Sequence, residues 1–334
     1  MKNPLVSVNI LTYNGENLIE DCLKSVLEQT YPNIEVLVID NASTDNTLSR
    51  IKNQESGIRI VQNDKNLGFA AGHNIGIKES GGEYVLCLNQ DVVLDKDFIK
   101  YGVEAMEKDH ASLAGGDKIG SVQGKLYQRD KILDVTGLMM LKNRRVIARG
   151  QGQEDKGQYN KSEEIFGVDG AAPLYRRRVL EDTKINNEYF DEDFFCYKED
   201  VDLAWRMRLY GWKAVYEPRA IAYHLRGAGE RAVKNYISVA LARRKISEFA
   251  KFYSFKNDRL MRIKNELPGL FSCHIFAILI KEIGAWLYVL FLEHYTWKSI
   301  KALIKEASNA WRKRKIIMTK KRANAKEIKK WFEN

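Results

Sequence analysis

YVLCLNQDVV, residues 84–93, is the stretch on which the predicted fold depends. The apolar run at 84–88 is typical of a buried parallel strand, and it leads directly into the polar turn Asn89-Gln90-Asp91. Open α/β sheets bind ligands at the carboxyl ends of their strands, so Asp91 is a candidate ligand for a metal ion or a phosphate group. The alternative is that Asp91 only caps a helix predicted over 95–106.

Earlier in the chain, three β-branched runs are each followed by polar residues in the same way. Strands are predicted at 6–11, 35–39 and 58–61, with helices at 17–28 and 48–52 between them. Strands that alternate with helices at this spacing predict an α/β fold with a mostly parallel, doubly wound sheet. The polar turns that follow the strands would then meet in one crevice.

Glycine recurs at every fourth position from 68 to 76. This spacing is explained by one close-packed face of a helix, and it also permits the phosphates of a ligand to approach the backbone closely. It is not the Gly-x-Gly-x-x-Gly pattern of dinucleotide-binding domains, and no such pattern follows the first strand. A dinucleotide-binding Rossmann domain is therefore not indicated.

Residues 108–164 are polar and rich in loops, with only short strands predicted at 121–126 and 146–149. This composition suits an insertion that faces a second substrate, and it equally suits ordinary surface loops. A helix is predicted next, at 174–181.

A second acidic block lies at 189–212, YFDEDFFCYKEDVDLAWRMRLYGW. A helix that begins near residue 200 and ends at Gly211 is predicted here, and acids at its start could simply stabilise the helix dipole. Six acids beside three aromatic residues exceed that need. Apolar surroundings raise the pKa of a carboxylate and make it a usable general base. Short strands at 214–217 and 220–223 then lead to His224.

The charge distribution and the cysteine content bear on the cellular compartment of the protein. The net charge of +10 comes from residues 298–334, which hold 13 Lys and Arg against 3 acids, whereas the rest of the chain holds 41 of each. No secretory signal is visible at the amino terminus. The four cysteines are far apart and predict neither a zinc site nor a disulfide framework, which fits a reducing cytoplasm.

Five ordered blocks resemble the family 2 inverting glycosyltransferases, which share the nucleotide-binding glycosyltransferase A fold. The blocks span about 1–230 and are VSVNILTYNG, VLVIDNASTDNT, NLGFAAGHNIGI, YVLCLNQDVVLD and FDEDFFCYKEDVDLAWRMRLYGW followed by His224. The subgroup resembled most is the bacterial rhamnosyltransferases, in which the metal motif is often Asn-Pro-Asp. The motif here, Asn89-Gln90-Asp91, lacks the first carboxylate of an Asp-x-Asp motif, which weakens the expected metal site.

The resemblance implies a role for each matching residue. Asp200 is the implied general base, with Glu199 as the reserve candidate, because an inverting transfer needs one carboxylate to take the acceptor's proton and needs no protein nucleophile. Asp91 and His224 are the implied ligands of Mg²⁺ or Mn²⁺, although a lone histidine more often packs than ligates. Binding of the nucleotide-sugar is implied for Thr12, Tyr13, Asn14, Asp40, Asn66, Asn74, Asn89, Asp91 and Arg206, and contact with the acceptor for Asp169 and Asp191. Arg206 could instead form a structural ion pair.

The carboxyl-terminal hundred residues predict helices, the first over 231–253. Residues 270–292 are strongly apolar but are interrupted by Lys281 and Glu282, which favours a helix or helical pair lying in the membrane interface over one that crosses it. Residues 297–313 combine an apolar stripe with a basic one, which indicates an anionic membrane surface more than nucleic acid. The alternative is a helical subdomain packed on the catalytic one.

These observations predict two regions, a catalytic domain at 1–230 and a helical, basic region at 231–334. The predicted function is transfer of a sugar, rhamnose from dTDP-rhamnose, to a cell-surface polysaccharide or lipid-linked acceptor at the inner face of the plasma membrane. A UDP-sugar donor and an inactive glycan- or membrane-binding scaffold are the alternatives. The body contains no recognised nucleic-acid module, so no specific nucleic-acid partner is expected. The sequence does not indicate an oligomeric state.

Overall fold

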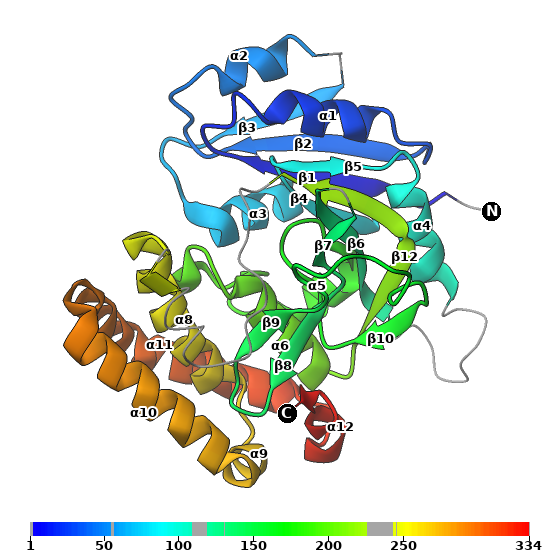
Figure 1. Ribbon diagram of the computed structural model, residues 1–334. Helices are drawn as coiled ribbons and strands as arrows, with labels where there is room; N and C mark the ends of the chain where they lie inside the picture. The colour runs from blue at the N-terminus through cyan, green and yellow to red at the C-terminus, as the bar shows by residue number, and fades with distance from the viewer. Residues whose placement is uncertain are drawn as a thin grey trace.

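The structure is a computed structural model that describes residues 3–54, 57–108, 119–129, 131–225, 243–244 and 246–333. Its first half forms the parallel part of a large mixed sheet (Figure 1). The parallel strands are β1 (Val6–Thr12), β2 (Ile34–Asp40), β3 (Ile58–Gln62) and β4 (Tyr84–Asn89). β1 lies between β2 and β4, and β3 lies outside β2. The predicted parallel sheet is therefore confirmed.

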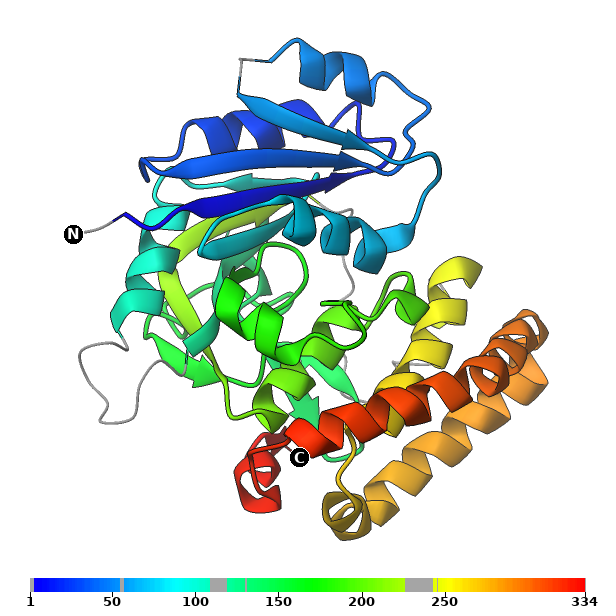
Figure 2. The same ribbon diagram turned by 180° about the vertical axis from the view of Figure 1, so that it is seen from behind.

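Helices cover both faces of these strands, as a doubly wound sheet requires (Figures 1 and 2). Alternate residues of β1 point to opposite faces, and Val6, Val8 and Ile10 share one buried cluster with the apolar side of α1. Helix α3 packs on β1 and β2 from the other face. The four helices of this half are α1 (Ile19–Leu27), α2 (Thr47–Lys52), α3 (Gly68–Glu79) and α4 (Phe98–Glu107).

The regularly spaced glycines of α3 allow the helix to lie close to the sheet. A Cβ atom at Gly72 would lie 2.4 Å from Cδ1 of Leu11, and one at Gly76 would lie 2.8 Å from Cδ1 of Ile39. Neither distance is tolerated by real side chains, so these two glycines serve helix–sheet packing. The expectation that they admit a ligand's phosphates is not met.

The second half of the chain extends the sheet past β4. β11 runs antiparallel between β4 and β6, and β12 runs parallel to β6. The strands added here are β5 (Val92–Leu94), β6 (Ile119–Arg129), β7 (Ile132–Val135), β10 (Glu163–Ile165), β11 (Leu174–Arg176) and β12 (Lys213–His224). The helix predicted at 174–181 is wrong in its first turn, which is β11, and continues as α5 (Arg177–Thr183). The two strands predicted at 214–223 are one strand with a register shift.

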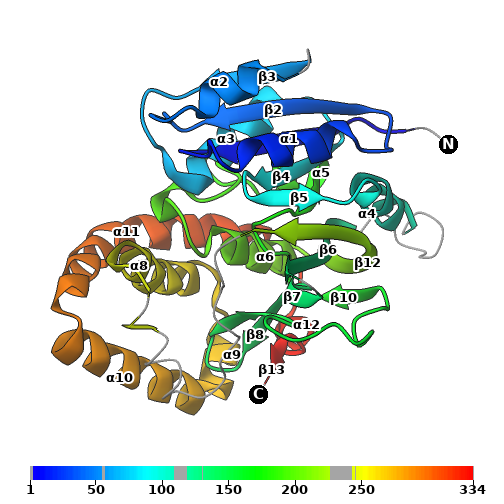
Figure 3. The same ribbon diagram turned by 45° about the horizontal axis from the view of Figure 1, so that its top comes forward.

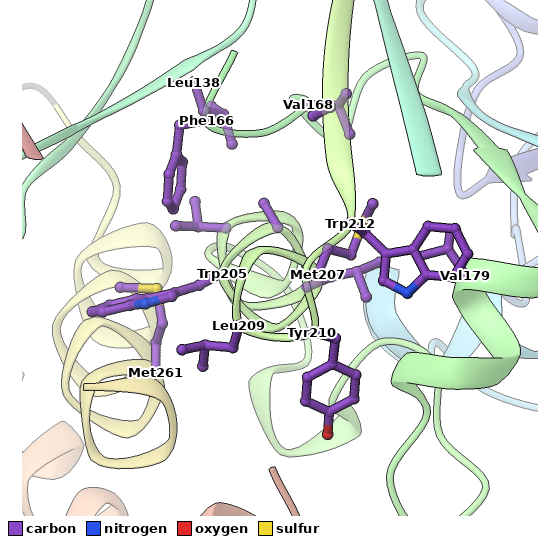
Figure 4. Close-up of a cluster of buried hydrophobic side chains, with 14 of the residues drawn as sticks. Leu138, Phe166, Val168, Val179, Trp205, Met207, Leu209, Tyr210, Trp212 and Met261 are labelled. Carbon is purple, nitrogen blue, oxygen red and sulfur yellow. The ribbon is translucent and has the colours of Figure 1, made fainter. Parts of the chain in front are cut away.

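Helix α6 (Glu199–Leu209) is buried on nearly all sides, which is why the sequence of the acidic block shows no clear apolar face. Figure 4 looks along this helix and shows Trp205 and Leu209 directed towards Met261, with Met207 and Tyr210 on the other side near Trp212. The short 3₁₀ helix η2 (Glu192–Phe194) precedes it.

The carboxyl-terminal region consists of helices wrapped along one side of the sheet domain (Figures 1 and 3). The helices are α8 (Glu248–Asn265), α9 (Pro268–Cys273), α10 (Ile275–Leu292), η3 (His294–Thr296), α11 (Trp297–Lys320) and α12 (Ala325–Lys329). The last strand, β13 (Phe332–Glu333), joins a small second sheet with β8 (Leu138–Leu141) and β9 (Val146–Ala148). Most of the helix predicted at 231–253 lies outside the described residues, which resume fully at 246.

Candidate active site

The polar turns after β1, β2 and β4 lie side by side at one edge of the sheet. In the strand register, Thr12 is the partner of Asp40, and Leu11 is the partner of Asn89. The carboxyl ends of three parallel strands therefore meet, as the sequence predicts. Asp40 is buried, and its carboxylate accepts the backbone N–H of Ser43 at 3.2 Å, so it fixes the loop after β2.

Gln90, the middle residue of the Asn-Gln-Asp turn, ties that turn to the end of β1. Its Oε1 accepts hydrogen bonds from Oγ1 of Thr12 at 2.5 Å and from the backbone N–H of Tyr13 at 3.0 Å. The Tyr13 ring stays exposed beside this contact. Asn14 is held by the next loop, because its Oδ1 accepts the N–H of Thr44 at 2.9 Å. Sequence reasoning misses the role of Gln90, although the residue lies inside the motif.

His224 and Asp91 lie together, as expected for two candidate metal ligands. Nε2 of His224 is 3.2 Å from Oδ1 of Asp91, and Nδ1 is 2.8 Å from Oδ2 of Asp134. Asp134 is fully buried and also accepts a hydrogen bond from Gln128. A carboxylate behind the second ring nitrogen orients an imidazole for ligation. Sequence reasoning misses Asp134 because it lies in a loop-rich segment with no motif around it.

Asp200 lies at the start of α6, and its pKa suits a general base. Its Oδ2 accepts the N–H of Gly170 at 3.1 Å, and its Oδ1 accepts that of Val201 at 2.7 Å. Burial, together with the nearby charge of Asp169, raises the pKa of Asp200 to about 6. Burial and the charge of Asp200 raise the pKa of Glu199 well above its usual value. Ionisation of Glu199 is therefore disfavoured, whereas Asp200, with a pKa of about 6, is mostly ionised at neutral pH.

The backbone before this pair adopts an unusual conformation that helix α8 holds in place. Phe195, Tyr197 and Lys198 have φ angles of 60°, 69° and 75°, which non-glycine residues rarely adopt. The side-chain amide of Asn257 in α8 donates to three acceptors in this loop, at 2.9, 2.9 and 2.8 Å, the carbonyls of Phe194, Cys196 and Tyr197. A residue of the carboxyl-terminal region therefore shapes the wall of the candidate site.

One cleft of about 440 Å³ brings the two acidic blocks together. Asn89 and His224 line it together with Asp169, Glu199 and Asp200. Strand β9 contributes residues 146–148 to the lining, where the sequence predicts a short strand at 146–149. A titratable base and His224, one of the two candidate cation ligands, thus line the same cleft.

Three residues predicted to contact ligands lie in the core instead. The guanidinium of Arg206 is buried against Asp202 at 3.1 Å and two backbone carbonyls, so it forms the structural ion pair that was the alternative. Asn74 is fully buried and bonds the backbone of Phe190. Asp191 is paired with lysines of α8 and α11.

Asn66 lies just before α3 and Asp169 lies in the cleft lining, and the ligand contacts predicted for both stay predictions. Oδ1 of Asn66 accepts the N–H of Gly68 at 2.8 Å and shapes the start of α3. Asp169 lines the cleft, and its Oδ1 accepts the N–H of Ala171 at 3.0 Å. Neither position contradicts a role in ligand contact.

Comparison with known proteins identifies the family. The model described as "Glycosyl transferase family 2" matches residues 7–184. Poly-beta-1,6-N-acetyl-D-glucosamine synthase of Staphylococcus epidermidis is 29% identical over 228 residues, which are 66% of this chain and 50% of that protein. The chain thus spans about half the length of the curated relatives it matches.

Two solved structures share the fold. S. aureus TarS 1-349 in complex with UDP-GlcNAc has a TM-score of 0.55 at 18% identity, covering 94% of this chain and 90% of that chain. The mannosyltransferase PcManGT from Pyrobaculum calidifontis, in complex with GDP-Man and Mn²⁺, has a TM-score of 0.52 at 18% identity, covering 93% and 76%. Since the family model covers more than half of a chain whose fold and acidic cleft agree with it, the protein belongs to glycosyl transferase family 2.

Proposed function

We propose that this protein is an inverting glycosyltransferase that moves a sugar from a nucleotide diphosphate donor to a hydroxyl group of a glycan or lipid-linked acceptor. The observation that carries the proposal is the cleft that Asp200, with a pKa of about 6, lines together with Asn89 and His224. A catalytic domain at 1–230 and a helical region at 231–334 remain the domain division that we propose.

The proposed chemistry is a single displacement. The acceptor oxygen attacks the anomeric carbon on the face opposite the diphosphate, the carbon–oxygen bond to the diphosphate breaks, and the hydroxyl proton passes to Asp200. Glu199 is the reserve candidate for the base, because burial and the charge of Asp200 raise its pKa and disfavour its ionised form. Asp169 keeps the pKa of Asp200 high by its charge and is a candidate contact for the acceptor.

The residues at the sheet edge fit a divalent cation, Mg²⁺ or Mn²⁺, bound by Asp91 and His224. With a proton on Nδ1 facing Asp134, the Nε2 lone pair would point at the carboxylate of Asp91, 3.2 Å away, and a cation would relieve that repulsion. The described residues contain no group of three or more such ligands, so the donor's phosphates would complete the shell. The cation would stabilise the charge on the departing diphosphate.

The donor would lie along the turns that contain Thr12, Tyr13, Asn14 and Asp40, with Asn66 at its border. Two donors are in competition. The Asn-Gln-Asp motif resembles that of rhamnosyltransferases and favours dTDP-rhamnose, whereas the names of the relatives favour UDP-GlcNAc and a cell-surface polysaccharide product.

A thermal-shift panel of dTDP, UDP, GDP and their sugars, each with and without Mn²⁺, tests this proposal. We expect one nucleotide to raise the unfolding temperature selectively and more strongly with Mn²⁺. Asp91→Asn should remove the metal-dependent part, and the surface change Asp21→Asn should keep it. No response to any nucleotide from the folded protein would favour the inactive scaffold.

We also propose that α10 attaches the protein to an anionic membrane surface on the cytoplasmic side. By length and composition alone α10 could cross a membrane. However, Lys281 and Glu282 on its inner side form ion pairs with Asp258, Arg259 and Arg262 of α8. Crossing would carry the charges of α8 into hydrocarbon, so an orientation along the surface is favoured.

A further inference from the structure

A second cavity, of about 310 Å³, lies beside the catalytic cleft between α8 and α10. Ser254 and Phe255 of α8, Gly284 and Ala285 of α10 and Val146 of β9 contribute to its walls. Figure 3 shows α8 and α10 on the same side of the molecule, separated by a gap between the ribbons and away from the parallel strands β1 to β4. Its volume is at the lower end of ligand sites, which hold about 300–1,000 Å³, so it suits part of a larger ligand.

The cavity adjoins the catalytic cleft. Val146, Lys198 and Ser254 line both spaces. Lys198 directly precedes the Glu199-Asp200 pair, and its ammonium is close enough to lower the pKa of Asp200. A molecule whose hydroxyl group reaches Asp200 can therefore extend past Lys198 into the cavity.

The lining of the cavity combines positive charge with apolar surface. Its basic members outnumber its single acid, Asp258, and are Arg145, Lys198, Arg243, Arg259 and Lys281. Glu282 and Glu293 pair with Arg259 and Arg243 from outside the lining. The Lys198 ammonium forms no ion pair with a carboxylate of the described residues. Such a site favours a ligand that carries an anionic group next to a hydrocarbon chain.

The apolar part of the cavity leads to the outer face of α10. Gly284 and Ala285 face the cavity, while large apolar side chains of the same helix are exposed on the outside, namely Phe276, Ile280, Ile283, Leu287 and Phe291. An acyl or isoprenoid chain that left the cavity would therefore remain on apolar surface. A free glycan would leave these apolar walls without a partner.

We propose that this cavity binds the phosphate group and the first carbons of a lipid-linked acceptor, and that the lipid chain continues along α10. The inference rests on the proposed function, because it names the acceptor class of the same site. The phosphate lies beside Lys198, and the glycan hydroxyl lies at Asp200. The bulk of the chain stays in the membrane, since the cavity is too small to hold it.

Binding of farnesyl diphosphate to the full chain tests the inference without any need for catalysis. Calorimetry should give saturable binding, and farnesol and inorganic diphosphate should each bind at least about tenfold more weakly, because each lacks one half of the recognised group. Equal binding of farnesol would overturn the inference, since it would reduce the interaction to apolar adsorption.

Gly284→Phe is the decisive variant, because a Cβ atom at Gly284 meets no other atom within 4 Å and the ring would obstruct the cavity. Gly269→Phe in α9 is the matched control, also with open space around its Cβ but outside the cavity lining. We expect Gly284→Phe to weaken farnesyl diphosphate binding by about tenfold or more and Gly269→Phe to leave it unchanged. Unchanged binding in Gly284→Phe, with the unfolding temperature retained, would sink the proposal.

Lys198→Asn separates the charge from the shape of the cavity, because asparagine tolerates the positive φ of this position. It should remove the preference for farnesyl diphosphate over farnesol, and a retained preference would contradict the role of Lys198. The nucleotide panel is run on the same samples. Selective lipid binding without any nucleotide response would refute the transferase proposal and leave the lipid site standing. A nucleotide response without selective lipid binding would refute the lipid site and leave the transferase proposal standing.

Discussion

At the residue scale, the site depends on which of its neighbouring carboxyl groups ionises most readily. Glu199 and Asp200 are adjacent, buried and close to Asp169. Ionising all three carboxyl groups at once is therefore costly. The hydrogen bonds from Gly170 and Val201 favour the charged form of Asp200. These hydrogen bonds suit Asp200 to accept a proton, whereas burial and the charge of Asp200 disfavour the ionised form of Glu199.

Removing the Asp200 carboxylate should abolish transfer while stabilising the fold. Asp200→Asn is expected to lower kcat by about 10²-fold or more, because general-base catalysis supplies roughly that factor, and to leave donor binding unchanged. A raised pKa means that ionisation costs stability as pH rises from 3.8 towards 6, and the full cost persists above pH 6. Melting curves should therefore show a higher unfolding temperature for the variant at pH 8 and no difference near pH 3. Near-normal turnover would remove Asp200 from the role of base.

The pH profile of transfer should report the same group. Below pH 6 the rate is expected to fall by about tenfold per pH unit, because the protonated carboxyl cannot accept the acceptor's proton. Asp169→Asn removes the neighbouring charge and should shift the profile to lower pH. Donor affinity, measured in parallel, should stay flat over the same range. A profile that Asp169→Asn does not move would contradict this electrostatic explanation.

At the element scale, helix α10 has two unlike faces. The inner face pairs Lys281 and Glu282 with charges of α8, and Ile278 and Val289 are the two buried residues of the helix. The outer face is apolar and exposed, with Phe276 81% and Phe291 71% accessible. An apolar surface of this kind on a charged protein marks a binding face.

Charges placed on that outer face should release the protein from membranes. Ile280→Glu combined with Ile283→Glu is expected to reduce flotation with anionic liposomes by about tenfold or more, because carboxylates are costly in the interface. Asn53→Glu combined with Gln62→Glu adds the same charge at the opposite end of the molecule, near α2 (Figure 1), and should float like the wild type. Equal flotation of both double variants would contradict membrane attachment through α10.

At the scale of the whole molecule, buried ion pairs join the carboxyl-terminal helices to the catalytic part. Lys264 of α8 contacts Asp191 and lies 2.8 Å from Asp202, and Lys313 of α11 lies 2.6 Å from Asp191. Burial alone would raise the pKa of Asp191, but the two ammonium groups hold it well below its usual value. A chain cut near residue 230 would remove both lysines and leave Asp191 without an ion-pair partner among the described residues, so point variants test the membrane face more cleanly than truncation.

Breaking this network should destabilise the entire protein. Lys264→Met is expected to lower the free energy of unfolding by about 3–5 kcal/mol, because it leaves Asp202 and Asp191 short of a compensating charge. Lys315→Met replaces a lysine of α11 outside this network and should change stability by no more than about 0.5 kcal/mol. Urea unfolding curves measure both. A small loss in Lys264→Met would mean that the helices are only loosely joined to the catalytic part.

The family resemblance implied the pairing of Asp91 with His224. The sequence alone determined the strand and helix order of the first half and the edge at which its polar turns meet. These features follow from local periodicity and from the rule that parallel strands end at one edge, so short stretches encode them. Only the tertiary structure decided which polar side chains face the cleft.

Arg206 and Asn74 looked like ligands beside acids and glycines, but their partners Thr183 and Phe190 hold them in the core. Asp134 and Asn257 gained their roles through His224 and Phe194, which are 90 and 63 positions away in the chain. The direction of a polar side chain depends on such distant partners, and local sequence pattern does not contain them.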